Sequence, residues 1–182
     1  MNSRLGKIAI AMVAFVLSFT LFFAFQTDRN DSSLDSQAQA AVPLDIALQN
    51  DKPSLMEFYA DWCTSCQAMA GDLEAIKHEY GDTVNFVMLN VDNTKWLPEI
   101  LRYRVDGIPH FVYLDARGEV VGESLGEQPR SILEADINAL VANSALPYAR
   151  ATGKVSQFEA KIKPTASPDD PRSHGSSVKV NS

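Results

Sequence analysis

The folded part of the chain is marked by apolar residues that recur at helical spacing or in short runs between residues 42 and 150. Short runs bounded by turn residues indicate strands, and a spacing of three and four residues indicates helices. The pattern predicts helices over 44–48, 63–80 and 97–103 and from Pro129 onward, and strands over 55–60, 84–91, 111–114 and 120–124. The last two strands flank a hairpin turn at 115–118. This alternation predicts an α/β domain with a mixed sheet.

A separate apolar run precedes this domain at residues 8–25, which are 18 residues without a charge. As a helix that rises about 1.5 Å per residue, the run is about 27 Å long, close to the hydrocarbon thickness of a bilayer. Arg4 and Lys7 precede it, so the positive-inside rule leaves residues 1–7 in the cytoplasm and sends the rest of the chain across the membrane. A cleaved signal peptide with a site at 38–40 is the alternative, and the length of the run favours an uncleaved transmembrane anchor.

The two segments that flank the domain differ from it in composition. Residues 26–41 are rich in Ser, Asp, Gln and Ala, which predicts a flexible tether. Residues 151–182 contain several prolines and few large apolar residues, which predicts a disordered tail. The formal net charge is −7, and the domain at 42–150 holds 8 Lys and Arg against 17 Asp and Glu. This acidic balance argues against a nucleic-acid partner, because such affinity depends on neutralising phosphates.

The chemistry-bearing residues are the only two cysteines, Cys63 and Cys66, which lie between a predicted strand and a predicted helix. The N-terminus of a helix stabilises a thiolate over a thiol, and a thiolate is the species that attacks a disulfide. A second thiol one turn later can resolve the mixed disulfide. The alternatives are a structural disulfide, a pair of inert buried thiols and a zinc site. A zinc site needs about four ligands, which the sequence does not offer at suitable spacing, so we expect no metal.

The segment from Met56 to Cys66, MEFYADWCTSC, closely resembles the active-site strand of the thioredoxin family, and Gly107-Ile108-Pro109 resembles the second signature of that family. The stretches 84–96 and 107–118 are similar to the membrane-anchored thioredoxin-like proteins of cyanobacteria and their chloroplast thylakoid counterpart. The resemblance implies a thioredoxin-like fold over 42–150, with a central mixed sheet of four or five strands flanked by helices.

Three catalytic positions follow from the resemblance. It implies that Cys63 is the nucleophile, that Cys66 is the resolving cysteine and that the two form a redox-active disulfide. It places Glu57 where the family keeps a buried carboxylate, which would accept the proton of Cys66 with a raised pKa. The pattern of β-strand residues alone leaves open whether Glu57 points inward or to solvent. We also expect the Cys63 sulfur to be reachable from solvent.

The resemblance also implies a binding site for substrate. Pro109 would be a cis-proline opposite the dithiol, and the backbone of Ile108 would be free to pair with an extended substrate segment. Trp62 would form an apolar wall beside the sulfurs. His110 follows the proline and is more often structural than functional at such a position.

Three departures from the family pattern limit what can be transferred. Thr64-Ser65 replaces the usual Gly-Pro between the cysteines, and hydroxyls there would stabilise a thiolate and make the protein a better oxidant. Met88 stands where many thioredoxins have a lysine, which would remove a charge near the carboxylate. A first strand before residue 44 is not evident, which favours four strands over five.

Together these features predict a membrane-anchored thiol–disulfide oxidoreductase that exchanges disulfides with protein substrates in the periplasm or thylakoid lumen. The resemblance implies a membrane electron carrier of the CcdA type as a partner, membrane lipid around residues 8–25 and a role in the biogenesis of cytochromes or photosynthetic complexes. We expect no organic or metal cofactor. The alternatives are a disulfide donor and a non-catalytic thioredoxin-fold binding module or metallochaperone.

Overall fold

The computed structural model of the protein describes residues 12–20 and 33–158. The elements after residue 33 follow one another in this order: α2 (Leu34–Ala40), α3 (Leu44–Ala47), β1 (Ser54–Tyr59), α4 (Thr64–Tyr80), β2 (Asn85–Asn90), a 3-10 turn (Thr94–Trp96), α5 (Leu97–Arg102), β3 (Gly107–Ile108), β4 (His110–Leu114), β5 (Val120–Leu125), α6 (Arg130–Val141) and β6 (Ser156–Gln157). The helices and strands predicted within 42–150 are all present, with ends shifted by one or two residues.

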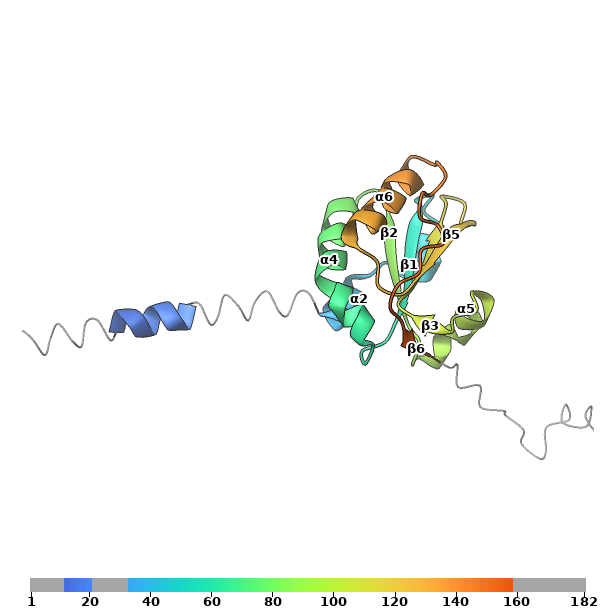
Figure 1. The fold of residues 1–182 in the computed structure, drawn as a ribbon. Helices are drawn as coiled ribbons and strands as arrows, with labels where there is room; N and C mark the ends of the chain where they lie inside the picture. Colours follow the sequence, from blue (N-terminus) through green and yellow to red (C-terminus); the bar gives the residue numbers. More distant parts are fainter. Residues whose placement is uncertain (1–11, 21–32, 159–182) are drawn as a thin grey trace, which may run out of the picture.

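The main sheet has four strands in the order β2-β1-β4-β5 (Figure 1). β1 pairs with β2 in parallel and with β4 antiparallel, and β4 pairs antiparallel with β5, so the sheet is mixed as predicted. The hairpin between β4 and β5 turns at Gly118, whose φ of +77° is open to glycine at little cost. Its start is fixed by Asp115, whose Oδ1 accepts hydrogen bonds from the backbone of Arg117 and Glu119.

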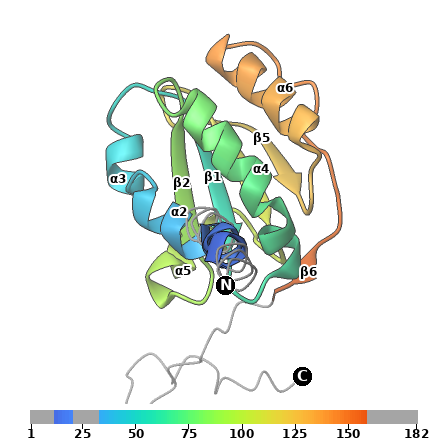
Figure 2. The ribbon, with the colours of Figure 1, turned by 90° about the vertical axis from the view of Figure 1, so that its left-hand side faces the viewer.

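Helices cover both faces of this sheet. α4 and α6 lie across one face, as Figure 2 shows. Their apolar residues form a buried cluster with Leu55 of β1, Phe86 of β2 and alternate residues of β4. α5 lies on the opposite side in Figure 1, where Ile100 packs into a second cluster with Met56 and Phe58 of β1. The second cluster extends along β1 to Cys63 and Cys66. The centre of the sheet therefore positions the cysteine pair.

The segment before β1 differs from the predicted flexible tether. Residues 34–40 form α2, which begins at Ser33, whose hydroxyl accepts a hydrogen bond from the backbone of Ser36. Leu34 and Gln37 of α2 are buried. Among the described residues, no strand forms before β1. The chain touches β2 at one point, where the Val42 N–H donates to the Phe86 carbonyl at 2.9 Å, and then turns into α3.

The segment after α6 differs from the predicted disordered tail, which was expected to begin at residue 151. Residues 149–153 run alongside β5, where Leu125 donates to the carbonyl of Ala151 at 2.9 Å and accepts from Gly153 at 2.7 Å. The chain then forms β6, which pairs antiparallel with β3 in a separate two-stranded sheet. The residues after 158 lie outside the described part.

The predicted membrane segment at 8–25 lies largely outside the described residues, which include only 12–20 of it, in helical conformation. Within the described part of the chain, no helix combines the length and the apolar character needed to cross a membrane. The predicted cytoplasmic residues 1–7 and the span 26–32 are likewise outside the described residues.

Candidate active site

The cysteine pair lies at the N-terminus of α4, directly after β1. Cys63 is the N-cap residue of the helix, and its Sγ accepts a hydrogen bond from the Cys66 backbone N–H at 3.0 Å. The two sulfurs form a disulfide of 2.07 Å. In the reduced protein, the same N–H and the positive end of the α4 dipole would stabilise a thiolate on Cys63.

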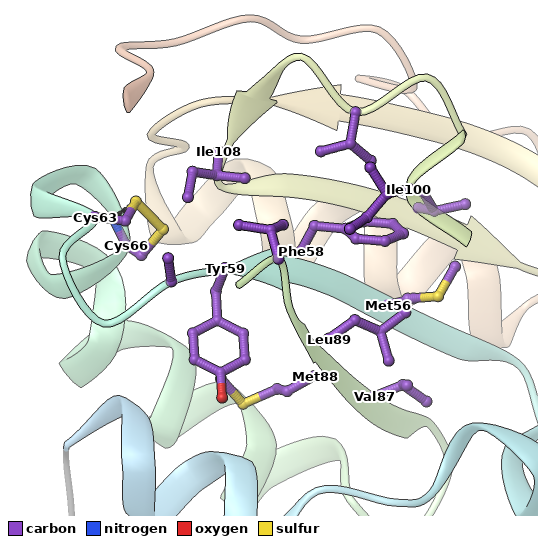
Figure 3. Packing of buried hydrophobic residues seen from close by; sticks show 14 of the residues in the cluster. Met56, Phe58, Tyr59, Cys63, Cys66, Val87, Met88, Leu89, Ile100 and Ile108 are labelled. Atoms are coloured by element: carbon purple, nitrogen blue, oxygen red, sulfur yellow. Dashed lines mark hydrogen bonds between the residues drawn. A yellow bond between two sulfur atoms is a disulfide. The ribbon is translucent and has the colours of Figure 1, made fainter. Parts of the chain in front are cut away.

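The burial of the pair differs from the expected exposure. Cys63 and Cys66 are both 0% exposed, and they belong to the same buried apolar cluster as Ile108 (Figure 3). The expectation that the Cys63 sulfur can be reached from solvent is therefore wrong for this conformation. An incoming sulfur needs some part of the surrounding structure to move.

The residues around the cysteines divide into buried and exposed ones. Thr64 is exposed, whereas Ser65 is buried and its Oγ has no hydrogen-bond partner among the described residues. Trp62 is 48% exposed, and its indole N–H donates to Asp92 Oδ2 at 2.8 Å. The indole is thus held at the surface beside the pair by a loop that follows β2.

Glu57 points into the protein, which resolves the ambiguity of the strand pattern. The residue is 2% exposed, and neither carboxylate oxygen has a hydrogen-bond partner among the described residues. The Nζ atom of Lys77, from α4, lies 3.6 Å from Glu57 Oε2. Burial raises the pKa of Glu57, and the neighbouring Lys77 ammonium opposes that rise. Burial also lowers the pKa of Lys77, against the attraction of Glu57.

The lysine is held in place by two further residues. Lys77 Nζ donates to Gln37 Oε1 at 2.7 Å and lies 3.1 Å from Met88 Sδ. Gln37 in turn donates to the carbonyl of Ala70 at 2.8 Å, which joins α2 to α4. Met88 is opposite Glu57 in the β1–β2 register. Methionine at 88 brings no charge to the carboxylate, as expected, and Lys77 of α4 supplies a cation there instead.

The Ile108–Pro109 peptide bond is cis, as the resemblance implies. The backbone of Ile108 is not free, however, because β3 is paired with β6 and Ile108 lies opposite Ser156. Ile108 is 0% exposed. The structure therefore corrects the expectation of an open edge before Pro109.

His110 follows the proline and begins β4. Its ring is 6% exposed, and its Nε2 lies 3.3 Å from Glu123 Oε2 on β5. Burial lowers the pKa of His110, and Glu123 opposes this. The ring also contacts Phe58 edge-on. These contacts fit the structural role that the sequence favours.

Among residues 12–20 and 33–158, no group of three or more His, Cys, Asp or Glu side chains is arranged to hold a metal ion. The site offers the chemistry of its two sulfurs, with a buried carboxylate and ammonium nearby. Sequence reasoning missed Lys77 and Gln37. Lys77 follows Ile76 on the predicted helix and could have been noted as a cation on its inner face. Gln37 lies in a polar segment, where nothing in the sequence indicates that its side chain is buried.

The comparisons with known proteins agree with this geometry. The sequence model of the Thioredoxin family matches residues 38–139. The thiol:disulfide interchange protein TxlA homolog of Synechocystis sp. is 56% identical over 173 residues, which are 95% of this chain and 96% of that protein. The thiol:disulfide interchange protein TxlA of Synechococcus elongatus is 50% identical over 97% of this chain and 93% of its own length. The thioredoxin-like protein HCF164, chloroplastic, of Arabidopsis thaliana is 44% identical over 91% of this chain, which spans 63% of that protein.

Proposed function

On the premise that the chain belongs to the thioredoxin family and is a thiol–disulfide oxidoreductase, we propose that it reduces disulfides of protein substrates on the non-cytoplasmic side of a membrane. The observation that supports this most strongly is the Cys63–Cys66 disulfide at the N-terminus of α4. A pair at this place can cycle between dithiol and disulfide without a cofactor.

The reaction has two steps. The Cys63 thiolate attacks one sulfur of a substrate disulfide, so a Cys63–substrate disulfide forms and the other substrate sulfur leaves as a thiolate. The sulfur of Cys66 then attacks Cys63, which forms the Cys63–Cys66 disulfide and releases the second substrate thiolate. Two electrons pass from the dithiol to the substrate, and another protein must supply two electrons to restore the dithiol.

Glu57 is proposed as the group that takes the proton of Cys66 during the second step. Its support is burial on the α4 side of β1, where both oxygens are without hydrogen-bond partners among the described residues. Because burial raises its pKa, the carboxylate binds a proton more readily than an exposed glutamate does. The neighbouring Lys77 ammonium favours the ionised carboxylate, which is the form that can accept that proton.

Trp62, Ile108 and Pro109 are proposed as the substrate-binding residues. The exposed indole of Trp62 adjoins the pair. Ile108 precedes the cis bond and shares the buried cluster of the cysteines. An extended substrate segment would pair with the Ile108 backbone in place of β6 and pass Trp62 to reach Cys63.

The membrane location is proposed from the sequence. Residues 8–25 would span the bilayer in contact with lipid, residues 1–7 would be cytoplasmic, and the domain would face the periplasm or thylakoid lumen. A CcdA-type membrane carrier would supply the electrons, and the substrates would belong to cytochrome or photosynthetic complex biogenesis. We expect the full chain to stay with membranes after alkaline extraction and to lose its domain to protease added from the non-cytoplasmic side. Release of the full chain into the soluble fraction would contradict an uncleaved anchor.

The test of the proposed reaction is reduction of insulin disulfides by the full chain with a chemical reductant as the electron source. We expect turnover by the native chain, a stable mixed disulfide with Cys66→Ser, and neither with Cys63→Ser. Absence of a mixed disulfide would favour the alternative of a non-catalytic binding module or metallochaperone.

A second candidate, a disulfide donor that oxidises its targets, is favoured by the buried hydroxyl of Ser65 next to Cys66. A donor to the Cys63 thiolate would stabilise the reduced form. A midpoint potential of about −120 mV would indicate a donor, and one of about −270 mV would indicate a reductant.

A further inference from the structure

The strand that precedes Pro109 is already paired with the chain's own C-terminal segment. β3 and β6 are antiparallel, with Ile108 opposite Ser156, and the Phe158 N–H donates to the Asp106 carbonyl at 3.2 Å. In an antiparallel pair, residues two apart present their N–H and C=O to the same partner. Ile108 therefore directs its backbone groups toward β6, and these are the groups that a substrate segment would need.

The same segment packs against the buried cluster to which the reactive sulfur belongs. The Phe158 side chain packs against the buried cluster that contains Cys63, Cys66 and Ile108. Cys63 is 0% exposed, so bond formation with a substrate sulfur requires a displacement. Residues 152–158 are exposed or only partly buried, whereas Ser54–Tyr59 of β1 and Ser65 and Cys66 of α4 are buried. Displacing the C-terminal segment therefore disrupts less buried structure than displacing β1 or the start of α4.

Two glycines allow this segment to lie close to the loop after β5. A Cβ atom on Gly153 would lie 1.8 Å from the carbonyl oxygen of Glu127, and one on Gly126 would lie 2.5 Å from the carbonyl oxygen of Gly153. The close approach is accompanied by a hydrogen bond from the Glu127 N–H to the Lys154 carbonyl at 2.8 Å. The sequence therefore permits a main-chain contact here that any side chain at 153 would prevent.

We propose that residues 152–158, the C-terminal strap, occupy the substrate-pairing edge of β3 and that a protein substrate reaches Cys63 by displacing them. This inference rests on the proposed function and adds to it the kind of partner that the edge accepts. The partner is an extended polypeptide whose main chain pairs with Ile108 and whose apolar side chain replaces Phe158. A disulfide without an extended flanking segment cannot make this exchange and is expected to react slowly.

The first test perturbs the strap and leaves the dithiol unchanged. Gly153→Ala places a Cβ against Glu127, and Gly71→Ala is its matched control, because Gly71 is exposed on α4 with no atom within 4 Å of an added Cβ. We expect the reduced Gly153→Ala chain to be alkylated by a maleimide about tenfold faster than the native chain, because the C-terminal strap is displaced in a larger fraction of the molecules. Gly71→Ala should match the native rate, and the midpoint potential should be the same in all three proteins.

This comparison needs no substrate, so its failure is distinct from failure of the proposed function. Equal alkylation rates for the native chain and Gly153→Ala, or a slower rate for Gly153→Ala, would overturn the strap. If the native chain reduced no disulfide while Gly153→Ala was alkylated faster, the proposed function would fail and the strap would remain as a cover of the cysteines.

A second measurement covers the case in which Gly153→Ala does not fold. Hydrogen exchange of the Phe158 amide is compared between the oxidised native chain and the mixed disulfide that Cys66→Ser forms with unfolded insulin chains. The insulin thiols are first converted to activated disulfides, so that Cys63 attacks the insulin sulfur and the activating thiol leaves. We expect protection of this amide in the free protein and its loss in the mixed disulfide. Protection that persists in the mixed disulfide would show that the substrate does not replace the strap.

Discussion

Replacing Lys77 by methionine tests how the buried carboxylate is kept ready to accept a proton. Lys77→Met removes the ammonium at 3.6 Å from Glu57 Oε2 and puts an apolar side chain beside Met88. At an effective dielectric constant of about 20, two unit charges at this distance attract by about 4–5 kcal/mol, which is an upper bound on the loss. The Lys77 ammonium lowers the pKa of Glu57 against the effect of burial, so we expect the pKa of Glu57 to rise when the ammonium is removed.

The consequence is visible in the pH dependence of the reaction. With a higher pKa, a smaller fraction of Glu57 is ionised and able to take the proton of Cys66 at a given pH, so the rise in the rate of insulin reduction should move to higher pH. The control is Lys52→Met, which removes an exposed cation whose Nζ donates to the Asp82 carbonyl. Its rate profile should match that of the native chain. Superimposable profiles for Lys77→Met and the native chain would refute the role given to the ion pair.

Lys77→Met also changes how the free energy of unfolding depends on pH. The folded pKa of Glu57 is raised above its usual 4.5, so its contribution to stability is full below that pH and is lost as pH rises through the folded pKa. In Lys77→Met the loss should extend to higher pH, which urea unfolding at a series of pH values would measure. If the loss of stability ended at the same pH in Lys77→Met and in the native chain, the expected rise in the pKa of Glu57 would be contradicted.

Two further predictions concern local features of the site and the hairpin. Ser65→Ala should make the midpoint potential more negative by about 30–60 mV, because a hydrogen bond to a thiolate contributes about 1.5–3 kcal/mol. The control Thr64→Ala, at an exposed position, should leave the potential unchanged. Equal potentials for Ser65→Ala and the native chain would mean that the buried hydroxyl does not donate to the thiolate. Gly118→Ala should lower the free energy of unfolding by about 1 kcal/mol or more, because φ is +77° at this turn and an alanine is strained there. The control Gly71→Ala on α4 should not destabilise the protein. An unchanged midpoint of thermal unfolding for Gly118→Ala would contradict the backbone strain expected for alanine at this turn.

The sequence was sufficient for the elements whose own residues carry a regular pattern. β1, α4 and β2 show continuous or periodic apolar positions, and the hairpin has a glycine where positive φ is needed. The cysteine pair at the start of α4 followed from the same pattern, because its position between a strand and a helix was readable without a structure. The cis bond at Pro109 required the resemblance.

What the sequence did not predict depends on contacts between distant parts of the chain. α2 contains only one large apolar residue, Leu34, so its polar composition resembled that of a tether although Gln37 is buried against α4. β6 has two residues and no periodicity, and it exists because β3 offers it a partner. The cation beside Glu57 comes from a helix rather than from β2, and only the packing of α4 on the sheet brings Lys77 to it.

The central claim is that Cys63, at the N-terminus of α4, is the attacking thiolate. The most direct measurement is the pKa of its thiol in reduced Cys66→Ser, where it is the only cysteine, followed by the ultraviolet absorbance of the thiolate. Stabilisation by the helix N-terminus predicts a pKa clearly below the usual value of about 8.5 for a free thiol. A pKa at or above that value would leave the proposed reaction without its nucleophile.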